Sequence, residues 1–164
     1  MMPLQCATLE RLSLDDMIAK STAIVRGKVT SVYAAQSGPA IYTHYRVEVS
    51  EQLKGPAANA VDVVVPGGTL RGVQQVLMGA PEIQAGDEFV FFLWTGRSGV
   101  TQIMGLTQGL FALPKDGGTD PVATRAASRE LMLDRGTGQP VKDQTIVMKL
   151  SELRSRIKGG VQQQ

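Results

Sequence analysis

The chain has 164 residues, 43% of them hydrophobic and 20% charged, which suffices for one domain with a substantial core and excludes disorder throughout. Seventeen Lys and Arg residues oppose fifteen Asp and Glu residues, and the formal net charge of +2 is smaller than the excess a dedicated nucleic-acid-binding protein concentrates on one face. Eighteen glycines and eight prolines are more typical of short strands joined by turns than of a helical bundle.

Cysteine and hydrophobicity patterns limit the class further. The single cysteine, Cys6, excludes an intrachain disulfide, and one cysteine with one histidine cannot form an ordinary structural zinc site, so we expect no metal and no cofactor. No apolar run is long enough to span a membrane, and residues 1–14 lack the apolar region of a signal peptide. We expect residues 1–10 to form a loose N-terminal arm with Cys6 as a surface thiol.

A short helix follows this arm. Ser13 is a good N-cap residue, and acidic side chains occupy the first turn, where the positive end of the helix dipole favours them. Leu14, Met17 and Ile18 fall on one face. The helix should end between Lys20 and Thr22, and it is short enough that it must pack on a sheet.

Two long strands come next. The first spans Ala23–Val32, where Gly27 indicates a bulge, and a loop at Ala34–Ala40 follows it. The second strand, Ile41–Leu53, alternates apolar and polar residues, so one face lies in a core and the other in water. The inward set is Ile41, Thr43, Tyr45, Val47 and Val49, and the outward set is Tyr42, His44, Arg46, Glu48 and Ser50.

A third strand at Val61–Val65 leads to a long irregular excursion, Thr69–Gly86, with one short strand. Connections of this length are more often functional than idle. The following strand, Glu88–Trp94, is apolar on both faces and should be a central strand covered on both sides. We expect further strands at Val100–Met104, Leu110–Leu113, Pro121–Ala126 (an edge strand) and Thr145–Leu150, with a hairpin tip at Asp134–Gly138.

The chain should end with a helix over Ser151–Lys158, capped by Ser151, and a disordered tail at 159–164. These elements predict a mainly β (α+β) single domain over 1–164, with a helix and barrel at 11–150. The expected architecture is an antiparallel, OB-like, closed or partly closed β-barrel with short helices near both ends. A two-sheet β-sandwich is the alternative.

Five segments carry a resemblance to a known family. They are STAIVRGKVTSV, YTHYRVEVSEQLKG, VDVVVPGG, GAPEIQAGDEFVFFL and GLTQGLFAL, which lie within residues 9–113. Together they resemble a bacterial family of exported β-domains of unknown function. The first half also resembles the OB-like barrel of netrin-type and tissue-inhibitor-of-metalloproteinase domains.

The resemblance implies a fold and an extracytoplasmic location, in the periplasm, at the cell surface or outside the cell. It does not extend to inhibition of metalloproteases, because those inhibitors use an N-terminal cysteine, and Cys6 is alone and not the first residue. A fold by itself does not specify a function.

Six residues are candidates for binding. His44, the only histidine, lies between Tyr42 and Arg46 on the outward face of its strand. A general base or metal ligand is one interpretation of His44, and a solvated surface residue is the interpretation we favour. Trp94 lies at a strand end, where an aromatic ring can be partly exposed. Arg71 and Met78 belong to the long excursion.

No nucleophile–base pair, metal set or phosphate-binding loop can be assembled from the sequence. The leading hypothesis is therefore a non-catalytic binding module of an exported bacterial protein, which uses the excursion to recognise a protein or a surface polymer. A nucleic-acid-binding OB module that uses Tyr42, Arg46 and Trp94 is the second hypothesis. An enzyme with a dispersed active site that includes His44 is the third.

Overall fold

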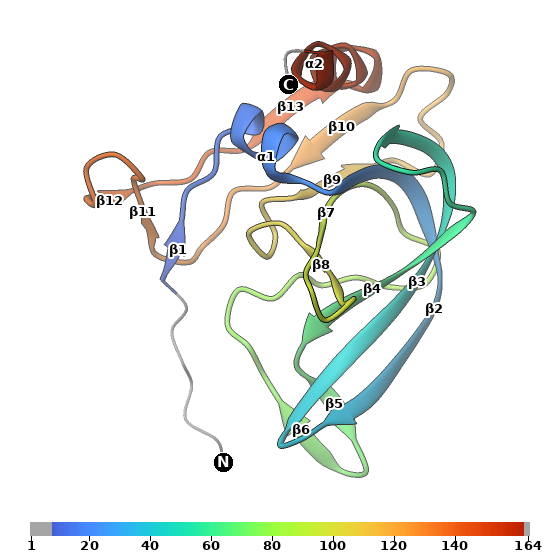
Figure 1. The fold of residues 1–164 in the computed structure, drawn as a ribbon, viewed down its shortest axis with the longest axis vertical. Helices are drawn as coiled ribbons and strands as arrows, with labels where there is room; N and C mark the ends of the chain where they lie inside the picture. The colour runs from blue at the N-terminus through green and yellow to red at the C-terminus, as the bar shows by residue number, and fades with distance from the viewer. Residues whose placement is uncertain (1–7, 163–164) are drawn as a thin grey trace.

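The computed structural model describes residues 8–162 and is mainly β (Figure 1). Its two helices are α1 (Leu14–Lys20) and α2 (Leu150–Gln162). The strands are β1 (Leu9–Glu10), β2 (Ala23–Ser37), β3 (Ala40–Lys54), β4 (Ala60–Pro66), β5 (Gly68–Leu70), β6 (Val73–Gln75), β7 (Glu88–Thr95), β8 (Thr101–Ile103), β9 (Leu110–Leu113), β10 (Val122–Arg125), β11 (Met132–Leu133), β12 (Pro140–Val141) and β13 (Ile146–Lys149).

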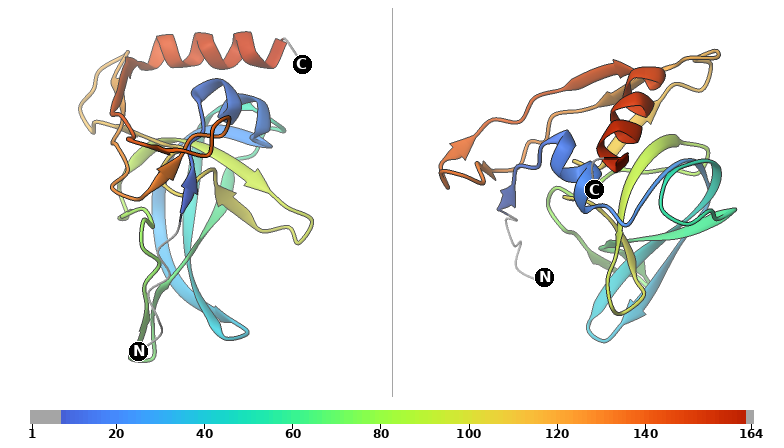
Figure 2. Two further views of the ribbon diagram at one scale, coloured as in Figure 1. Left: turned by 90° about the vertical axis from the view of Figure 1, so that its left-hand side faces the viewer. Right: turned by 45° about the horizontal axis from the view of Figure 1, so that its top comes forward.

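One large sheet dominates the structure. Its strand order is β13-β10-β9-β7-β2-β3-β4-β8, and β8 also pairs with β7, so that the pairings β7-β2-β3-β4-β8-β7 return to their starting strand. Within this sheet the pairs are antiparallel apart from β4 with β8. A small sheet, β1-β11-β12, lies beside α1, and β5 with β6 forms a separate hairpin (Figures 1 and 2).

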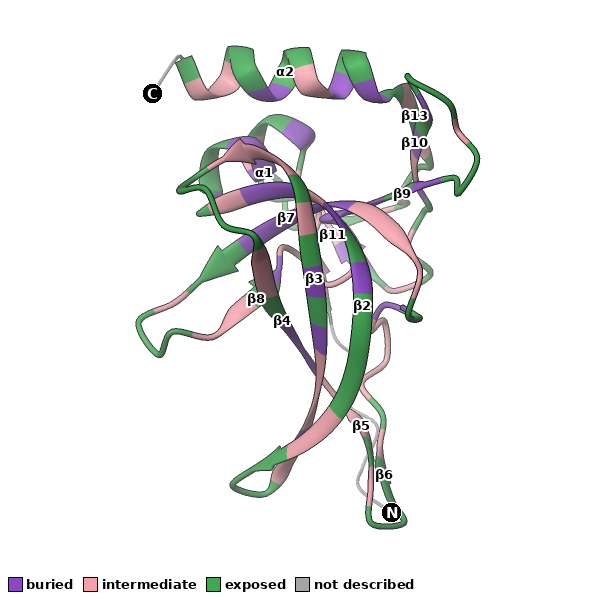
Figure 3. Ribbon diagram, turned by 90° about the vertical axis from the view of Figure 1, so that its right-hand side faces the viewer, coloured by how far each residue is buried: buried purple, intermediate pink, exposed green. Residues whose placement is uncertain are grey.

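The buried apolar residues form two clusters that share β7. Phe91 and Leu93 of β7 pack with Val25, Val47 and other inward residues of β2, β3 and β4. Val90 and Phe92 pack on the opposite side, with residues of α1, α2, β9 and β10. The prediction that this strand is covered on both sides is therefore confirmed. In Figure 3 the buried residues of α2 lie on the side of the helix that faces α1 and the sheet.

Helix α1 forms as its sequence predicts. The Ser13 hydroxyl accepts a hydrogen bond from the Asp16 amide at 3.0 Å, and Leu14, Met17 and Ile18 are buried. At the other end, Lys54 Nζ donates to the carbonyls of Ile18 (2.7 Å) and Ala19. A cation thus meets the negative end of the helix, which gives Lys54, the last residue of β3, a structural role.

The pair β2–β3 is longer than the sequence predicts. Pairing continues from Ala34 with Thr43 to Ser37 with Ala40, so the predicted loop at Ala34–Ala40 is wrong, and only Gly38 and Pro39 form the turn. Cross-strand pairing and contact with the β5–β6 hairpin override the weak strand propensity of Ala34 and its neighbours.

The predicted bulge is present, since the register shifts between Arg26 and Gly27. A Cβ atom at Gly27 would lie 2.4 Å from Val47 Cγ1, so this position requires glycine for space.

The excursion holds a hairpin rather than one short strand. Leu70 pairs with Val73 across a tip formed by Arg71 (φ 51°) and Gly72 (φ 77°), both in the left-handed region. The hairpin is anchored by the Gln75 side chain, whose Oε1 accepts from the Ile41 amide at 2.6 Å and whose Nε2 donates to the Pro39 carbonyl. It therefore lies along the far end of β2–β3, as Figure 1 shows.

The C-terminal half departs from the sequence predictions in two places. Strand β10 lies between β9 and β13 and is not an edge strand; β13 takes the edge. Helix α2 starts at Leu150, and its first turn is capped by Asp120, which accepts from the Ser151 amide (2.8 Å) and hydroxyl (2.7 Å). These hydrogen bonds from Ser151 hold the pKa of the Asp120 carboxyl below its usual range.

Both predicted loose ends are partly ordered. Helix α2 continues through 159–162, because Gly160 allows a close approach to Ile18; a Cβ there would lie 2.6 Å from Ile18 Cγ2. At the other end, Leu9–Glu10 forms β1, parallel to β11. The buried side chain of Gln108 holds this segment by accepting from the Leu12 amide and donating to the Glu10 carbonyl. Cys6 and the rest of 1–7, and residues 163–164, lie outside the described residues.

Candidate functional site

The alternation along β3 places three of the six candidate residues on one surface. Ile41, Tyr45 and Val47 are buried, whereas Arg46 on the opposite face is exposed, and Tyr42 and His44 are partly exposed. The expected division into an inward and an outward face is therefore confirmed. The outward residues are available for contact with other molecules.

His44 has two neighbours on this surface. Its Nδ1 atom lies 2.8 Å from Oδ2 of Asp62 on β4. Its ring stacks on Tyr33 of β2 with 4.7 Å between ring centroids and 8° between planes. The register explains both contacts. His44 lies directly opposite Tyr33 on β2, and on β4 Asp62 lies two residues from Val64, the residue opposite His44, so that it is on the same face. The Tyr33 residue is 53% exposed.

Arg46 and Tyr42 extend this surface along β3. Arg46 lies opposite Asp62 on β4 and Ser31 on β2. Tyr42 lies two residues from His44, on the side of the β2–β3 turn, and is opposite Pro66 on β4. We call the surface formed by these side chains the tyrosine–histidine face; its residues are Tyr33, Tyr42, His44, Arg46 and Asp62.

The charges of this surface are balanced. Arg46 is matched by Asp62 across the strand pair, and further along the strands Lys28 lies opposite Glu48. A phosphate backbone requires an excess of Lys and Arg along its path. The tyrosine–histidine face shows no such excess.

Trp94 lies elsewhere on the molecule. It is 47% exposed on β7 and pairs with Gln102 of β8. The indole folds back over Gly96, where an added Cβ would lie 2.8 Å from its Cη2 atom. Leu93, next to Trp94, pairs with Ala23 at the start of β2, whereas His44 pairs with Tyr33, ten residues further along that strand, a path of about 33 Å at the usual rise per residue. The structure therefore does not bring Trp94 together with His44.

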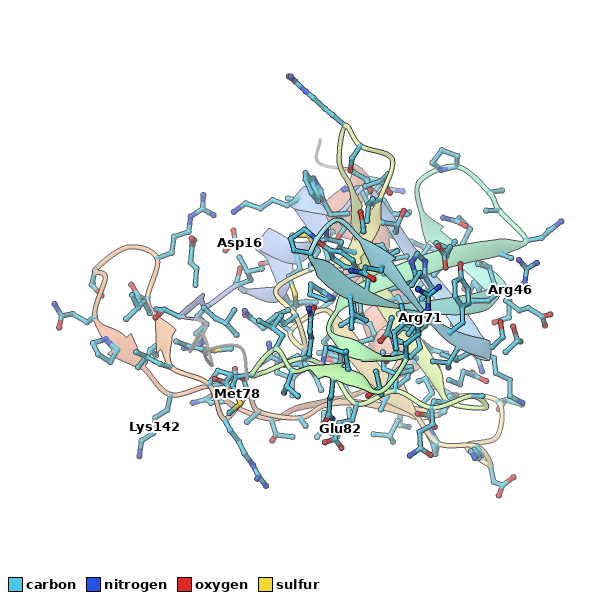
Figure 4. The ribbon with its side chains drawn as sticks, turned by 90° about the horizontal axis from the view of Figure 1, so that it is seen from below. Asp16, Arg46, Arg71, Met78, Glu82 and Lys142 are labelled. Carbon is cyan, nitrogen blue, oxygen red and sulfur yellow. The ribbon has the colours of Figure 1, made fainter. Side chains whose placement is uncertain are left out.

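Arg71 and Met78 are also apart from each other. Arg71 is exposed at the tip of the β5–β6 hairpin, and Met78 is half-buried in the segment that follows β6. Figure 4 shows Arg71 on the same side of the molecule as Arg46, with Met78 displaced toward Lys142. The two excursion residues thus do not form one contact surface.

The excursion does form one wall of an open cavity of about 470 Å³. The floor consists of buried residues that include Tyr45, Val65 and Ile83. Burial raises the pKa of the Tyr45 phenol above its usual value. The rim carries exposed polar residues, which are Thr69, Gln74, Glu82 and Gln84. Within residues 8–162, the lining contains no Lys, Arg or His.

Sequence reasoning missed Tyr33, Asp62 and the cavity. Tyr33 follows Val32, the last residue of the predicted strand, and Asp62 lies within the predicted strand Val61–Val65. The alternation along each strand was the available signal, but the contacts with His44 depend on the register between strands, which alternation does not specify.

Two further findings concern the described part of the chain. It contains no group of three or more His, Cys, Asp and Glu side chains that could hold a metal ion. Neither α1 nor α2 is long and apolar enough to cross a bilayer.

Comparison with known proteins identified no relative of this chain. No protein-family model matches the sequence, and no curated protein was found to be similar to it.

Proposed function

We propose that this chain is a non-catalytic protein-binding module built on an OB-type β-barrel. The returning series of strand pairs, β7-β2-β3-β4-β8-β7, supports the barrel, because a two-sheet sandwich has no need for β8 to pair with both β4 and β7. The cluster around Val47 and Phe91 would then be the barrel interior.

The observation that carries the binding role is the exposed Tyr33–His44 stack held by Asp62. The stack and the 2.8 Å contact fix the two rings before any partner arrives, so little side-chain entropy is lost on binding. Tyrosine and arginine are also enriched where protein interfaces concentrate their binding energy, and Arg46 lies next to the stack. A protein partner fits this surface better than a uniformly charged polymer does.

A pair of matched double variants tests this role. We expect Tyr33→Ala/Arg46→Ala to abolish capture of a partner identified by cross-linking from a photoreactive residue at position 42. The control is Leu131→Ala/Arg129→Ala, which removes an exposed apolar side chain and an exposed arginine outside this face. Equal capture by the two double variants, with both folded, would show that the tyrosine–histidine face is not the binding surface.

The proposal includes export from a bacterial cytoplasm, which rests on the resemblance of the five segments to exported β-domains. Fractionation of the native host tests it with an antibody against this chain. We expect the protein in the extracytoplasmic fraction, and detection solely in the cytoplasm would contradict this location.

Nucleic-acid binding is the second candidate, and the aromatic residues Tyr33 and Tyr42 favour it. The balanced charges around Arg46 weigh against it. Titration with a labelled single-stranded nucleic acid at low salt distinguishes protein binding from nucleic-acid binding. Affinity that falls steeply with added salt supports nucleic-acid binding, and absence of binding would contradict it.

Catalysis by His44 is the third candidate, and the adjacent carboxylate of Asp62 favours it. A histidine oriented by a carboxylate can act as a general base when a nucleophile or water is bound beside it. If His44 is catalytic, any hydrolase activity found in a broad screen should fall in the His44→Ala variant. Unchanged activity in that variant would contradict a catalytic role for His44.

A further inference from the structure

The cavity beneath the β5–β6 hairpin has firmly positioned walls. The Gln75 amide holds the hairpin to Ile41 of β3 and to Pro39 in the β2–β3 turn. Thr43 Oγ1 donates to the Gly67 carbonyl at 2.8 Å where β4 leads into the hairpin. A Cβ atom at Gly68 would lie 2.6 Å from Thr43 Oγ1, which shows how closely the hairpin is seated. The cavity is therefore a feature of the folded chain and does not depend on a loosely placed loop.

The floor and the rim differ in chemistry. Tyr45, Val65 and Ile83 form a floor of one aromatic ring and aliphatic side chains. Above them, within the described residues, the side-chain amides of Gln74 and Gln84 make no hydrogen bond. These amides each offer a donor and an acceptor group, as a hydroxyl does.

The charge of the lining excludes one class of ligand. Among the described residues, Glu82 is the one carboxylate in the lining, and no Lys, Arg or His side chain there could neutralise a phosphate or a carboxylate. A ligand with a negative charge would be placed near Glu82 without compensation. Purely apolar ligands also fit poorly, because they would leave the rim amides without partners on the ligand.

We propose that this cavity binds a neutral, hydroxyl-rich small molecule of the size of a mono- or disaccharide. A volume of about 470 Å³ falls in the range of small-molecule sites. The C–H groups of a sugar ring can contact the part of the apolar floor that borders the cavity, while its hydroxyl groups exchange hydrogen bonds with Gln74 and Gln84. This site is distinct from the tyrosine–histidine face, since Tyr45 points to the opposite side of β3 from His44.

Saturation-transfer NMR on the full chain tests the proposal directly. The probes are glucose, galactose, N-acetylglucosamine and maltose, each at about 10 mM, a concentration that reveals ligands with millimolar Kd. Glucose 6-phosphate serves as the anionic counterpart. We expect saturation transfer to at least one neutral sugar and none to the phosphorylated one.

Variants locate the binding. We expect Gln74→Ala/Gln84→Ala to weaken binding of the responding sugar about tenfold, the effect of losing one or two hydrogen bonds. The matched control is Gln102→Ala/Gln139→Ala, which removes two exposed glutamines outside the cavity and should leave the affinity unchanged. Circular dichroism checks that both double variants keep the fold.

Three results would overturn the proposal: no transfer to any of the neutral sugars, equal transfer to glucose 6-phosphate, or equal weakening by the control variant. None of them bears on the protein-binding role. The Tyr33→Ala/Arg46→Ala variant should bind the sugar as the unmodified chain does, and Gln74→Ala/Gln84→Ala should still capture the protein partner. The two sites can therefore fail or succeed independently.

Discussion

Arg154 on α2 binds Glu51 on β3 through two hydrogen bonds, Nε to Oε1 at 2.6 Å and Nη2 to Oε2 at 2.9 Å. This paired geometry is the strongest form of a contact between arginine and a carboxylate. It joins the C-terminal helix to a strand 103 residues earlier in the chain. The hydrogen bond from Arg154 lowers the pKa of the Glu51 carboxyl below its usual value of 4.5.

This pair should make stability depend on pH in the acid range. Because the folded-state pKa of Glu51 is lowered, its stabilising contribution is complete above about pH 4.5 and is lost as the pH falls through the folded-state pKa. Both side chains are about 30% exposed, so we expect Glu51→Gln to cost only about 1 kcal/mol at pH 7. Urea unfolding at pH 7 and pH 3 measures the free energy of unfolding of the variant and of the unmodified protein. The difference between these two free energies should be smaller at pH 3 than at pH 7.

The control for this prediction is Glu152→Gln, which removes the same charge from an exposed position of α2. A cost for Glu51→Gln that is the same at both pH values would contradict the role of the ion pair.

Two adjacent glycines in α2 should respond in opposite ways to alanine. A Cβ built at Gly159 meets no atom of another described element within 4 Å, so Gly159→Ala should stabilise the protein by about 0.5–1 kcal/mol through helix propensity. At Gly160 the added Cβ would lie 2.6 Å from Cγ2 of the buried Ile18, and the clash should outweigh that gain. Thermal unfolding of both variants checks this, and a higher Tm for Gly160→Ala would show that α1 and α2 are less closely packed.

A buried ion pair should be sensitive to loss of its acid. Arg125 and Asp143 are 2% and 1% exposed at their side chains, and Asp143 also accepts from the Ser128 amide at 2.7 Å. Asp143→Ala should cost about 3–5 kcal/mol, because it leaves a buried guanidinium without its counter-charge. Nε and Nη1 of Arg125 already have no hydrogen-bond partner in the described structure. Replacing both charged residues, in Arg125→Met/Asp143→Leu, should therefore lower the free energy of unfolding by less than Asp143→Ala alone, as measured by urea unfolding. A larger loss in the double variant would indicate that the ion pair is net stabilising.

Asp62 should matter for partner binding more than for stability. We expect Asp62→Ala to weaken binding of the protein partner about fivefold, because His44 loses the contact that fixes its ring. The free energy of unfolding should change by less than about 1 kcal/mol, since Asp62 is exposed. The control is Asp116→Ala, another exposed acid outside the tyrosine–histidine face. Titration of the identified partner measures both affinities, and equal values for the two variants would contradict the role of Asp62.

The sequence predicted those elements whose signals are local. Ser13 and the apolar residues after it define α1, and strict alternation identifies β3 and its two faces. Features that depend on distant partners could not be predicted this way. The contact between His44 and Asp62 needs the β3–β4 register, and the cap on α2 comes from Asp120, which precedes Ser151 by 31 residues.

Weak local signals account for other differences. Ala34 and Ala35 have little preference for a strand, yet they pair with Thr43 and Tyr42 at the far end of β2–β3. The pair Gly159–Gly160 reads as a helix end from propensity, while packing against Ile18 keeps it helical.

Strand β7 has a further consequence for how the chain avoids misfolding. A slip of one residue would exchange Phe91 and Phe92 between the two apolar clusters, and both environments would accept an aromatic ring, so hydrophobicity alone does not penalise the error. Backbone pairing must select the correct alignment instead. Strand β7 pairs with β2 along one edge and with β8 and β9 along the other. A slip of β7 would shift all three registers together, so its neighbours on both edges hold the central strand in position.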